Sequence, residues 1–338
     1  MKAYNLHSVN HLDYEDTPIP NCPSGWAIVQ VKAAGICSSD IPRIYTKGTY
    51  HFPTIPGHEF SGIVYSVVDN EYRPLIGKHV GVFPLIPCRK CQSCEEKHYE
   101  MCSNYDYIGS RRDGAFAEFV AVPVWNLVEL PDSVPFDEAA MMEPFAVALH
   151  AIKLGCVKPG MRVGIIGTGM IGIAAGQWAK MLGVESAIVI GRNNYKRKIV
   201  ENCGLEYKVC TDVSEIGEYD YVLEAVGTSK AVEIAISATK RGGHLVLMGN
   251  PSGDIFIKQS IYWKILRKQL QVAGTWNSSY DGNSSSDWTE VVDALVHNKI
   301  EACSLITHRY HQIDLEEGLK LMKEHKEPYC KVMTLWNE

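Results

Sequence analysis

Short runs of β-branched and other apolar residues, each bounded by Gly, Pro or Asp, recur through the first third of the chain. Runs of this length and composition are typical of strands. The clearest are residues 27–33, 62–68, 77–83 and 117–122. The sequence therefore predicts a compact, barrel-like β domain over residues 1–145.

A different pattern begins after residue 146, where apolar strands alternate with helices. Strands are predicted at 160–166, 186–190, 219–226 and 244–249, and helices at 173–182 and 230–239. This βαβ alternation is typical of a parallel, doubly wound sheet. We expect an α/β cofactor domain over residues 146–275, after which residues 276–338 return to the first domain.

Composition narrows the possible partners. The 338 residues carry a formal net charge of −6, with 46% hydrophobic and 21% charged residues, as in an ordinary globular protein. No basic surplus is available to neutralise nucleic-acid phosphates, and no apolar run is long enough to span a bilayer. We therefore expect a cytoplasmic protein with neither a nucleic-acid nor a membrane partner.

A glycine motif opens the predicted α/β domain. Gly167, Gly169 and Gly172 follow an apolar strand and precede a helix, with a second strand after it. In this setting the glycines allow a tight turn and close approach of a pyrophosphate to the helix N-terminus. We expect a dinucleotide to contact residues at the ends of successive strands: Gly167, Gly169, Met170, Ile171, Gly172, Gly191, Arg192, Asn193, Lys196, Arg197, Val226 and Gly249.

The end of the second strand of this domain bears on which nicotinamide cofactor is used. An NAD site favours Asp or Glu there, whereas this chain has Gly191 followed by Arg192. A guanidinium can pair with the 2′-phosphate of NADP. The sequence predicts a preference for NADP(H). The alternative is that Lys196 and Arg197 only form a solvated helix face.

Four cysteines, Cys88, Cys91, Cys94 and Cys102, follow the spacing C-x2-C-x2-C-x7-C. In a reducing compartment, clustered cysteines indicate metal ligands rather than disulfides. Four thiolates from one loop suit a closed tetrahedral zinc site, and the spacing also allows an iron–sulfur cluster. We expect a structural zinc lobe over residues 88–102.

A second set of ligand types lies outside that loop. Cys37 and His58 stand among glycines and close to the carboxylates Asp40 and Glu59, which suit the orientation of metal ligands. Glu143 lies in an apolar run, where a metal would compensate a buried carboxylate. Together they would give three ligands and leave one position open, as in catalytic zinc sites. The alternative for Glu143 is a helix N-terminal role beside Pro144.

With these residues, the chain resembles the zinc-containing medium-chain dehydrogenases, in particular their polyol dehydrogenase group. The marks are the stretches 35–40 and 57–59, the four-cysteine lobe, Glu143-Pro144 and the glycine motif. The resemblance implies a GroES-like β-barrel catalytic domain, a Rossmann domain and two Zn²⁺ per chain. It implies Cys37, His58 and Glu143 as ligands of the catalytic zinc, with Glu59 approaching the metal in some relatives.

The resemblance also implies Ser39 as the hydroxyl that relays the substrate proton, and a homodimer or homotetramer. The predicted reaction interconverts a polyol, expected as a polyol phosphate, and its ketose by hydride transfer to or from NAD(P). One departure weakens the substrate prediction: the polyol-phosphate enzymes of this group carry Asp where this chain has Gly191.

Basic residues suggest where a substrate phosphate would bind: Arg43, Lys47 and Arg111, with Arg112 beside them. The alternative is that Arg111 and Arg112 pair with Asp106 or Asp113. Two other functions stay open from the sequence. One is a dehydrogenase of unphosphorylated polyols or secondary alcohols, and the other is a non-catalytic NADP(H)-binding sensor on the same fold.

Overall fold

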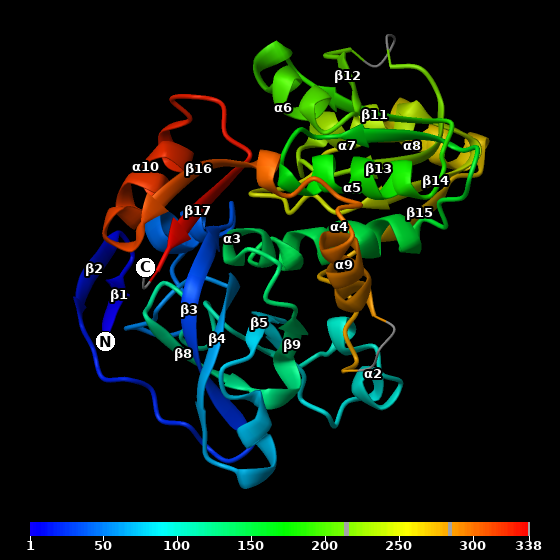
Figure 1. Cartoon of the computed structure of the whole chain (residues 1–338). Helices are drawn as coiled ribbons and strands as arrows, with labels where there is room; N and C mark the ends of the chain where they lie inside the picture. The colour runs from blue at the N-terminus through cyan, green and yellow to red at the C-terminus, as the bar shows by residue number, and fades with distance from the viewer. Residues whose placement is uncertain (213–215, 283–285, 337–338) are drawn as a thin grey trace. The chain divides into compact units, whose positions relative to one another are not determined.

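The computed structural model describes residues 1–212, 216–282 and 286–336. The chain forms two compact units (Figure 1). The first comprises Met1–Glu143, Ser279–Asn298 and Leu305–Glu338, and the second comprises Pro144–Ser278 and Lys299–Ser304. The predicted return segment, 276–338, thus contributes 276–278 and 299–304 to the second unit, and its residues 283–285 and 337–338 lie outside the described residues.

A mixed sheet of seven strands forms the first unit, which has the predicted GroES-like fold. The strand order is β16 (Ile306–His311), β17 (Lys331–Leu335), β3 (Trp26–Ile36), β4 (Glu59–Val67), β5 (His79–Val82) and β9 (Leu127–Leu130), with β8 (Phe119–Pro123) pairing with β3. Figure 1 shows β17, from the end of the chain, beside β3, from its beginning. Inward side chains of β3, such as Val29 and Val31, pack with Leu319 of helix α10 (Leu315–Glu324) and Trp336 in one core.

Shorter elements complete this unit. The helices are α1 (Asp40–Pro42), α2 (Gln92–Glu95), α3 (Phe136–Ala139) and α9 (Asp287–Val296), and a π-helical turn spans Arg43–Lys47. β6 (Leu85–Ile86) and β7 (Asp106–Tyr107) form one two-stranded sheet. β1 (Lys2–Ser8) and β2 (His11–Asp16) form another, which the sequence analysis did not predict. Its signal was present, because apolar residues alternate with polar ones in both strands.

Six parallel strands form the sheet of the second unit, as predicted for a Rossmann domain. Their order is β12 (Glu206–Val209), β11 (Ser186–Gly191), β10 (Arg162–Ile166), β13 (Tyr219–Glu224), β14 (Thr239–Leu247) and β15 (Gln271–Gly274). The helices are α4 (Met142–Leu154, which begins in the first unit), α5 (Met170–Met181), α6 (Arg197–Asn202), α7 (Ser229–Ala238) and α8 (Gln259–Lys268). Buried side chains such as Val222, Leu245 and Ala235 fill its core. None of the helices in the described ranges is long and apolar enough to cross a membrane.

Candidate active site and metal centres

Strand pairing assembles the first candidate site. Gly35, near the end of β3, pairs with Glu59, the first residue of β4, so Cys37 and His58 leave neighbouring strands at the same edge. The ligand atoms of Cys37, His58 and Glu59 lie within 4.8 Å of one another. His58 and Glu59 are buried, and Cys37 is half-buried. Sulfur, nitrogen and oxygen donors this close together form a ligand set that zinc accepts.

Asp40 organises the polypeptide around this cluster. It is fully buried at the start of α1, and its carboxylate accepts hydrogen bonds from the backbone N–H of Cys37 (2.9 Å) and from Arg43 (2.7 Å). His58 Nδ1 lies 3.5 Å from Asp40 Oδ1, an ionic contact too long for a good hydrogen bond. A carboxylate behind one ring nitrogen is the arrangement that orients a metal-ligating histidine through the other.

Asp40 and His58 each favour the charged form of the other. Burial disfavours the imidazolium, yet Asp40 and Cys37 together raise the pKa of His58 well above its ordinary value. Burial also opposes ionisation of Asp40, but His58 and Arg43 hold the pKa of that carboxyl below its usual range. The site thus keeps a buried carboxylate ionised beside the ring.

Lys331 is a member of the site that the sequence analysis missed. β17 pairs with the other edge of β3, which places Lys331 across from Glu59, and the two buried side chains form an ion pair. The pair crosses β3 at Gly35, where a Cβ would lie 2.6 Å from Glu59 Oε2. Lys331 Nζ also donates to the carbonyl of Ile36 at 3.4 Å. A lysine 272 residues from its partner gives no signal in the sequence.

Glu143, predicted as the third zinc ligand, does not belong to the cluster of Cys37, His58 and Glu59 found in the described chain. It is buried near the start of α4, where the hydroxyl of Tyr107 donates to its Oε1 at 3.4 Å. Burial and then the Glu59 carboxylate raise the pKa of Glu143 to about 7. A bound cation would relieve both effects. Glu143 therefore remains a candidate metal ligand beside Glu59.

The remaining predicted residues of this region lie along the chain that follows Cys37. Ser39 is half-buried at the N-cap of α1, two residues after Cys37. The exposed Lys47 ends the π-helical turn that begins at Arg43. Arg43 forms an ion pair with Asp40, so in this structure its guanidinium supports the candidate metal site.

The four-cysteine lobe has the geometry of a closed metal site. Its sulfur atoms lie 3.5 Å apart for Cys91 and Cys94, 3.8 Å for Cys91 and Cys102, and 4.0 Å for Cys88 and Cys94. Zn–S bonds of about 2.3 Å in a tetrahedron place sulfurs about 3.8 Å apart. Backbone N–H groups of Cys94 and Ser103 lower the pKa of Cys91 to about 6, which favours the thiolate that a metal binds.

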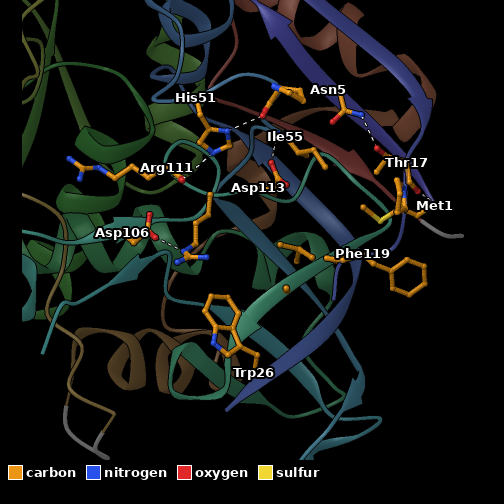
Figure 2. Close-up of a pocket in the computed structure, with 16 residues that line it drawn as sticks. Met1, Asn5, Thr17, Trp26, His51, Ile55, Asp106, Arg111, Asp113 and Phe119 are labelled. Carbon is orange, nitrogen blue, oxygen red and sulfur yellow. Dashed lines mark hydrogen bonds and ion pairs between the residues drawn. The ribbon is translucent and has the colours of Figure 1, made fainter. Parts of the chain in front are cut away.

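The arginines of the predicted phosphate site have different partners in the structure. Arg111 lies between the rings of Tyr50 and Tyr105, 4.3 and 4.5 Å from their centres, and donates to the Tyr105 carbonyl. Arg112 pairs with Asp106, which was the alternative for that residue. Both line a cavity of about 580 Å³ with Trp26 and His51 (Figure 2). Cys37, His58, Arg43 and Lys47 do not line this cavity.

The predicted dinucleotide residues all lie at one edge of the second unit's sheet. Gly167, Gly191, Val226 and Gly249 follow or end four parallel strands, whose carboxyl ends share that edge. Gly167 has φ +129°, and a Cβ at Gly172 would lie 2.2 Å from the Gly167 carbonyl oxygen. Gly169, the N-cap of α5, has open space around it, and Met170 and Ile171 form the first turn of that helix. These features fit a pyrophosphate at the helix N-terminus.

The NAD-discriminating position has no room for a side chain. A Cβ at Gly191 would lie 1.9 Å from the hydroxyl of Tyr207, which donates to the Asn193 carbonyl. Arg192 is exposed and forms no ion pair within the described residues. Arg197 instead bonds Glu201 at 3.1 Å and lies over the Tyr207 ring, and Lys196 belongs to the turn before α6. Of the three basic residues, Arg192 is therefore the one best suited to a 2′-phosphate.

Comparison with known proteins gives the same fold and chemistry. The alcohol dehydrogenase GroES-like domain matches residues 23–132, and the zinc-binding dehydrogenase domain matches residues 171–297. Galactitol 1-phosphate 5-dehydrogenase of Escherichia coli (strain K12) is 33% identical over 291 residues, covering 83% of this chain and 84% of that protein. The chain belongs to the zinc-binding medium-chain alcohol dehydrogenase family.

Solved structures agree. Galactitol-1-phosphate dehydrogenase from Escherichia coli superimposes with a TM-score of 0.90 at 30% identity, over 99% of this chain and 100% of that one. A structure from Sinorhizobium meliloti 1021, described as a zinc-binding dehydrogenase bound to NADP, has a TM-score of 0.87 at 27% identity, over 99% and 98%. One from E. coli CFT073, described as a short chain alcohol dehydrogenase complexed with NADH, has 0.90 at 25%, over 99% of each chain.

The family membership confirms the general function predicted from the sequence. The chain is a zinc-dependent, NAD(P)-dependent dehydrogenase of the alcohol and polyol type, with a small-molecule substrate and a nucleotide cofactor. The non-catalytic sensor is therefore set aside. The four-cysteine cluster is that of a zinc-binding family, which favours zinc over the iron–sulfur alternative.

Proposed function

We propose that this dehydrogenase oxidises a secondary hydroxyl of a polyol phosphate to the ketose phosphate, and catalyses the reverse reaction, with NADP(H). The observation that carries the proposal is the buried cluster of Cys37, His58 and Glu59, backed by Asp40 and Lys331. Cys37, His58 and one of the carboxylates Glu59 and Glu143 would hold the catalytic zinc. When bound, zinc supplies Lewis-acid stabilisation of a substrate alkoxide.

The residues of the chain have separate tasks in this proposal. Asp40 fixes the His58 ring from its Nδ1 side and, through the Cys37 N–H, the turn that carries the thiolate. Lys331 pairs with the buried Glu59 carboxylate and holds it in place. Ser39 Oγ, two residues after Cys37, accepts the substrate hydroxyl proton and passes it toward solvent. The second unit holds the dinucleotide at the carboxyl edge of its sheet.

NADP(H) preference is supported by Gly191 and Arg192. No carboxylate stands at the end of β11 to repel a 2′-phosphate, and the Tyr207 hydroxyl occupies the place where such a side chain would begin. The test compares kcat/KM with NADPH and NADH in the wild type and in Arg192→Ala. We expect NADPH to be preferred, and Arg192→Ala to raise KM for NADPH while KM for NADH stays unchanged. Equal or better use of NADH by the wild type contradicts the proposal.

A phosphorylated substrate is supported by the resemblance to the galactitol-phosphate enzyme and by Lys47, which is exposed at the end of the turn after Asp40. Arg43 is committed to Asp40, and Arg111 is held between two tyrosines, which favours the unphosphorylated polyol as the second candidate. A panel of ketoses and ketose phosphates, followed by NADPH absorbance, separates the two.

Lys47→Ala sharpens this panel. We expect it to raise KM for the phosphorylated substrate and to leave KM for the free sugar unchanged. Lys230→Ala, at an exposed position of the second unit, is the matched control. If the free polyol is the better substrate, or if Lys47→Ala changes neither constant, the phosphate assignment is wrong. We further propose a homodimer or homotetramer, which light scattering of the purified protein tests.

A further inference from the structure

The N-terminal hairpin presents a set of metal-ligand side chains that the dehydrogenase reaction does not use. β1 and β2 pair in an antiparallel register in which Asn5 faces Asp13 and Ala3 faces Glu15, with an irregularity between Leu6 and Ser8 that contains His7. Residues two apart in a strand share a face. Tyr4 and Leu6 are buried in the core of the first unit, so the opposite face of the hairpin carries the polar side chains. These are His7, His11, Asp13 and Glu15.

The donor atoms of His7, Asp13 and Glu15 converge, and His11 lies beside them. His7 Nε2 lies 2.9 Å from Glu15 Oε1 and 3.9 Å from Asp13 Oδ2. The same Asp13 Oδ2 lies 2.9 Å from His11 Nε2, and the two imidazole rings are 5.4 Å apart between centres. Donor atoms of His7, Asp13 and Glu15 all lie within 4.8 Å of one another. One ring nitrogen and two carboxylate oxygens thus lie around one point on the surface, and His11 contacts this group through Asp13.

We propose that this hairpin site, defined as His7, His11, Asp13 and Glu15, binds one divalent transition-metal ion in addition to the two zinc ions of the family. Metal–ligand bonds of about 2.0–2.2 Å in a tetrahedron place the donors about 3.3–3.6 Å apart. The present separations of 2.9 and 3.9 Å bracket that range, so small rotations of exposed side chains suffice. Imidazole with carboxylate suits Zn²⁺, Ni²⁺ and Cu²⁺ rather than the all-oxygen sites of Mg²⁺.

Charge and support also favour a cation here. The site contains two carboxylates, and a bound divalent ion is the largest local charge that such groups can meet. Asn5, which is buried, donates to Glu15 Oε1 at 2.8 Å and fixes that carboxylate from behind. All four ligand side chains are accessible, with exposures of 35% for His7, 60% for His11, 48% for Asp13 and 40% for Glu15.

The hairpin is tied to the polypeptide that follows the predicted catalytic residues. The N–H of Asn10, at its tip, donates to the Ile44 carbonyl at 2.7 Å, and Leu6 exchanges backbone hydrogen bonds with Thr54. A metal that joins β1 to β2 would therefore fix the frame against which residues 44–54 rest. Because the ion binds the folded hairpin and not the unfolded chain, it also raises the apparent stability.

The experiment uses tag-free enzyme that already holds its zinc. Ni²⁺ is equilibrated with the protein by dialysis, and bound nickel and zinc are both measured, so that replacement of zinc is distinguished from additional binding. We expect one further metal equivalent per chain and a rise in Tm. His7→Asn and His11→Asn should each weaken that binding by at least about tenfold, because loss of a ligand costs no less than loss of its support.

His297→Asn is the matched control, since His297 also lies beside a carboxylate, 3.0 Å from Asp293, but belongs to no group of metal-ligand side chains among the described residues. It should bind nickel as the wild type does. Circular dichroism of the variants before nickel is added checks that the substitutions in the hairpin leave the fold intact. Asp13→Asn provides an independent change of ligand. The proposal is overturned if the wild type binds no metal beyond its zinc, or if the His7→Asn/His11→Asn double variant still binds the additional equivalent.

Discussion

The four-cysteine lobe and the Cys37 cluster lie in the same unit, but they are assembled differently. All four thiols of the lobe come from residues 88–102, and the turns of that loop alone bring the sulfurs to 3.5–4.0 Å. The Cys37 cluster instead needs β3 and β4 in register, and its buried support comes from β17 at the far end of the chain. The lobe can form wherever its loop closes, whereas the Cys37 cluster exists only when the sheet is complete.

The two sites also differ in what surrounds the ligands. The sulfurs of the lobe can complete a tetrahedron by themselves, so a metal there has no position for substrate. Around Cys37 the structure places charged groups that are buried or nearly so: Asp40, Arg43, Glu59, Glu143 and Lys331. Buried charges are costly unless paired. This contrast supports the proposed catalytic role of the Cys37 cluster and a structural role for the lobe.

The largest effect is expected from a substitution in the Cys37 cluster. Cys37→Ser should lower kcat/KM by about 10⁴-fold, about 5 kcal/mol of transition-state stabilisation, because a proposed ligand of the catalytic zinc is lost. The fold and the zinc of the lobe should remain. Steady-state kinetics with metal analysis check this. An enzyme that retains most of its activity without this thiol would remove Cys37 from the site.

The next effect tests the support that arrives from β17. Lys331→Met should lower the free energy of unfolding by about 3–5 kcal/mol, because Glu59 is left as an uncompensated buried charge. Denaturant unfolding measures it. The double variant Lys331→Met/Glu59→Gln is the control, and it should recover part of the loss. A loss below about 1 kcal/mol in the single variant would mean that the pair is no more important than an exposed one.

Breaking the lobe should change stability more than chemistry. Cys91→Ser should release one zinc per chain and lower the unfolding free energy by at least about 3 kcal/mol, because the binding free energy of a structural zinc contributes to folding. kcat at low temperature should change far less than in Cys37→Ser. Cys156→Ser, which removes one exposed thiol from the second unit, should change neither quantity. Zinc analysis and thermal melts decide; unchanged zinc content in Cys91→Ser would contradict a four-cysteine site.

The smallest effect sets the scale for charges outside the two sites. Arg112 pairs with Asp106, and its side chain is 51% exposed. Arg112→Ala should therefore change the unfolding free energy by about 1 kcal/mol or less. The same unfolding curves that measure Lys331→Met give this value. An effect equal to that of the buried pair would mean that the Arg112–Asp106 pair, at the cavity of Figure 2, stabilises the protein more than its exposure implies.

The parts of this protein that were predictable from sequence depend on local patterns. The spacing of Cys88, Cys91, Cys94 and Cys102 was sufficient to predict their cluster, because a short loop constrains where its residues can go. The glycine motif and the βαβ alternation predicted the parallel sheet in the same way. The hairpin β1–β2 was missed although Tyr4 and Leu6 alternate with polar residues in β1, since β2 carries three acidic residues among its six.

Long-range pairing decided the rest. Nothing near Gly191 in the sequence reveals that the Tyr207 hydroxyl fills the space beside it, and nothing near Glu59 reveals Lys331. Arg43 and Arg111 looked equivalent as basic residues, but one is bound by Asp40 and the other lies between two tyrosines beside a separate cavity. Whether a charged side chain can bind a ligand depends on its neighbours in space. Strand order and register decide which residues those neighbours are.

The sequence alone determined the chemistry available to this chain: thiolates in a metal spacing, an imidazole and carboxylates among glycines, and a dinucleotide motif between a strand and a helix. Only the tertiary structure decided which of these groups meet. It placed Glu59 with Cys37 and His58, put Lys331 behind Glu59, and brought His7, Asp13 and Glu15 together on one face of the N-terminal hairpin. The physical reason is that a residue's type fixes what it can bind, whereas backbone pairing across the sheet fixes what lies within reach.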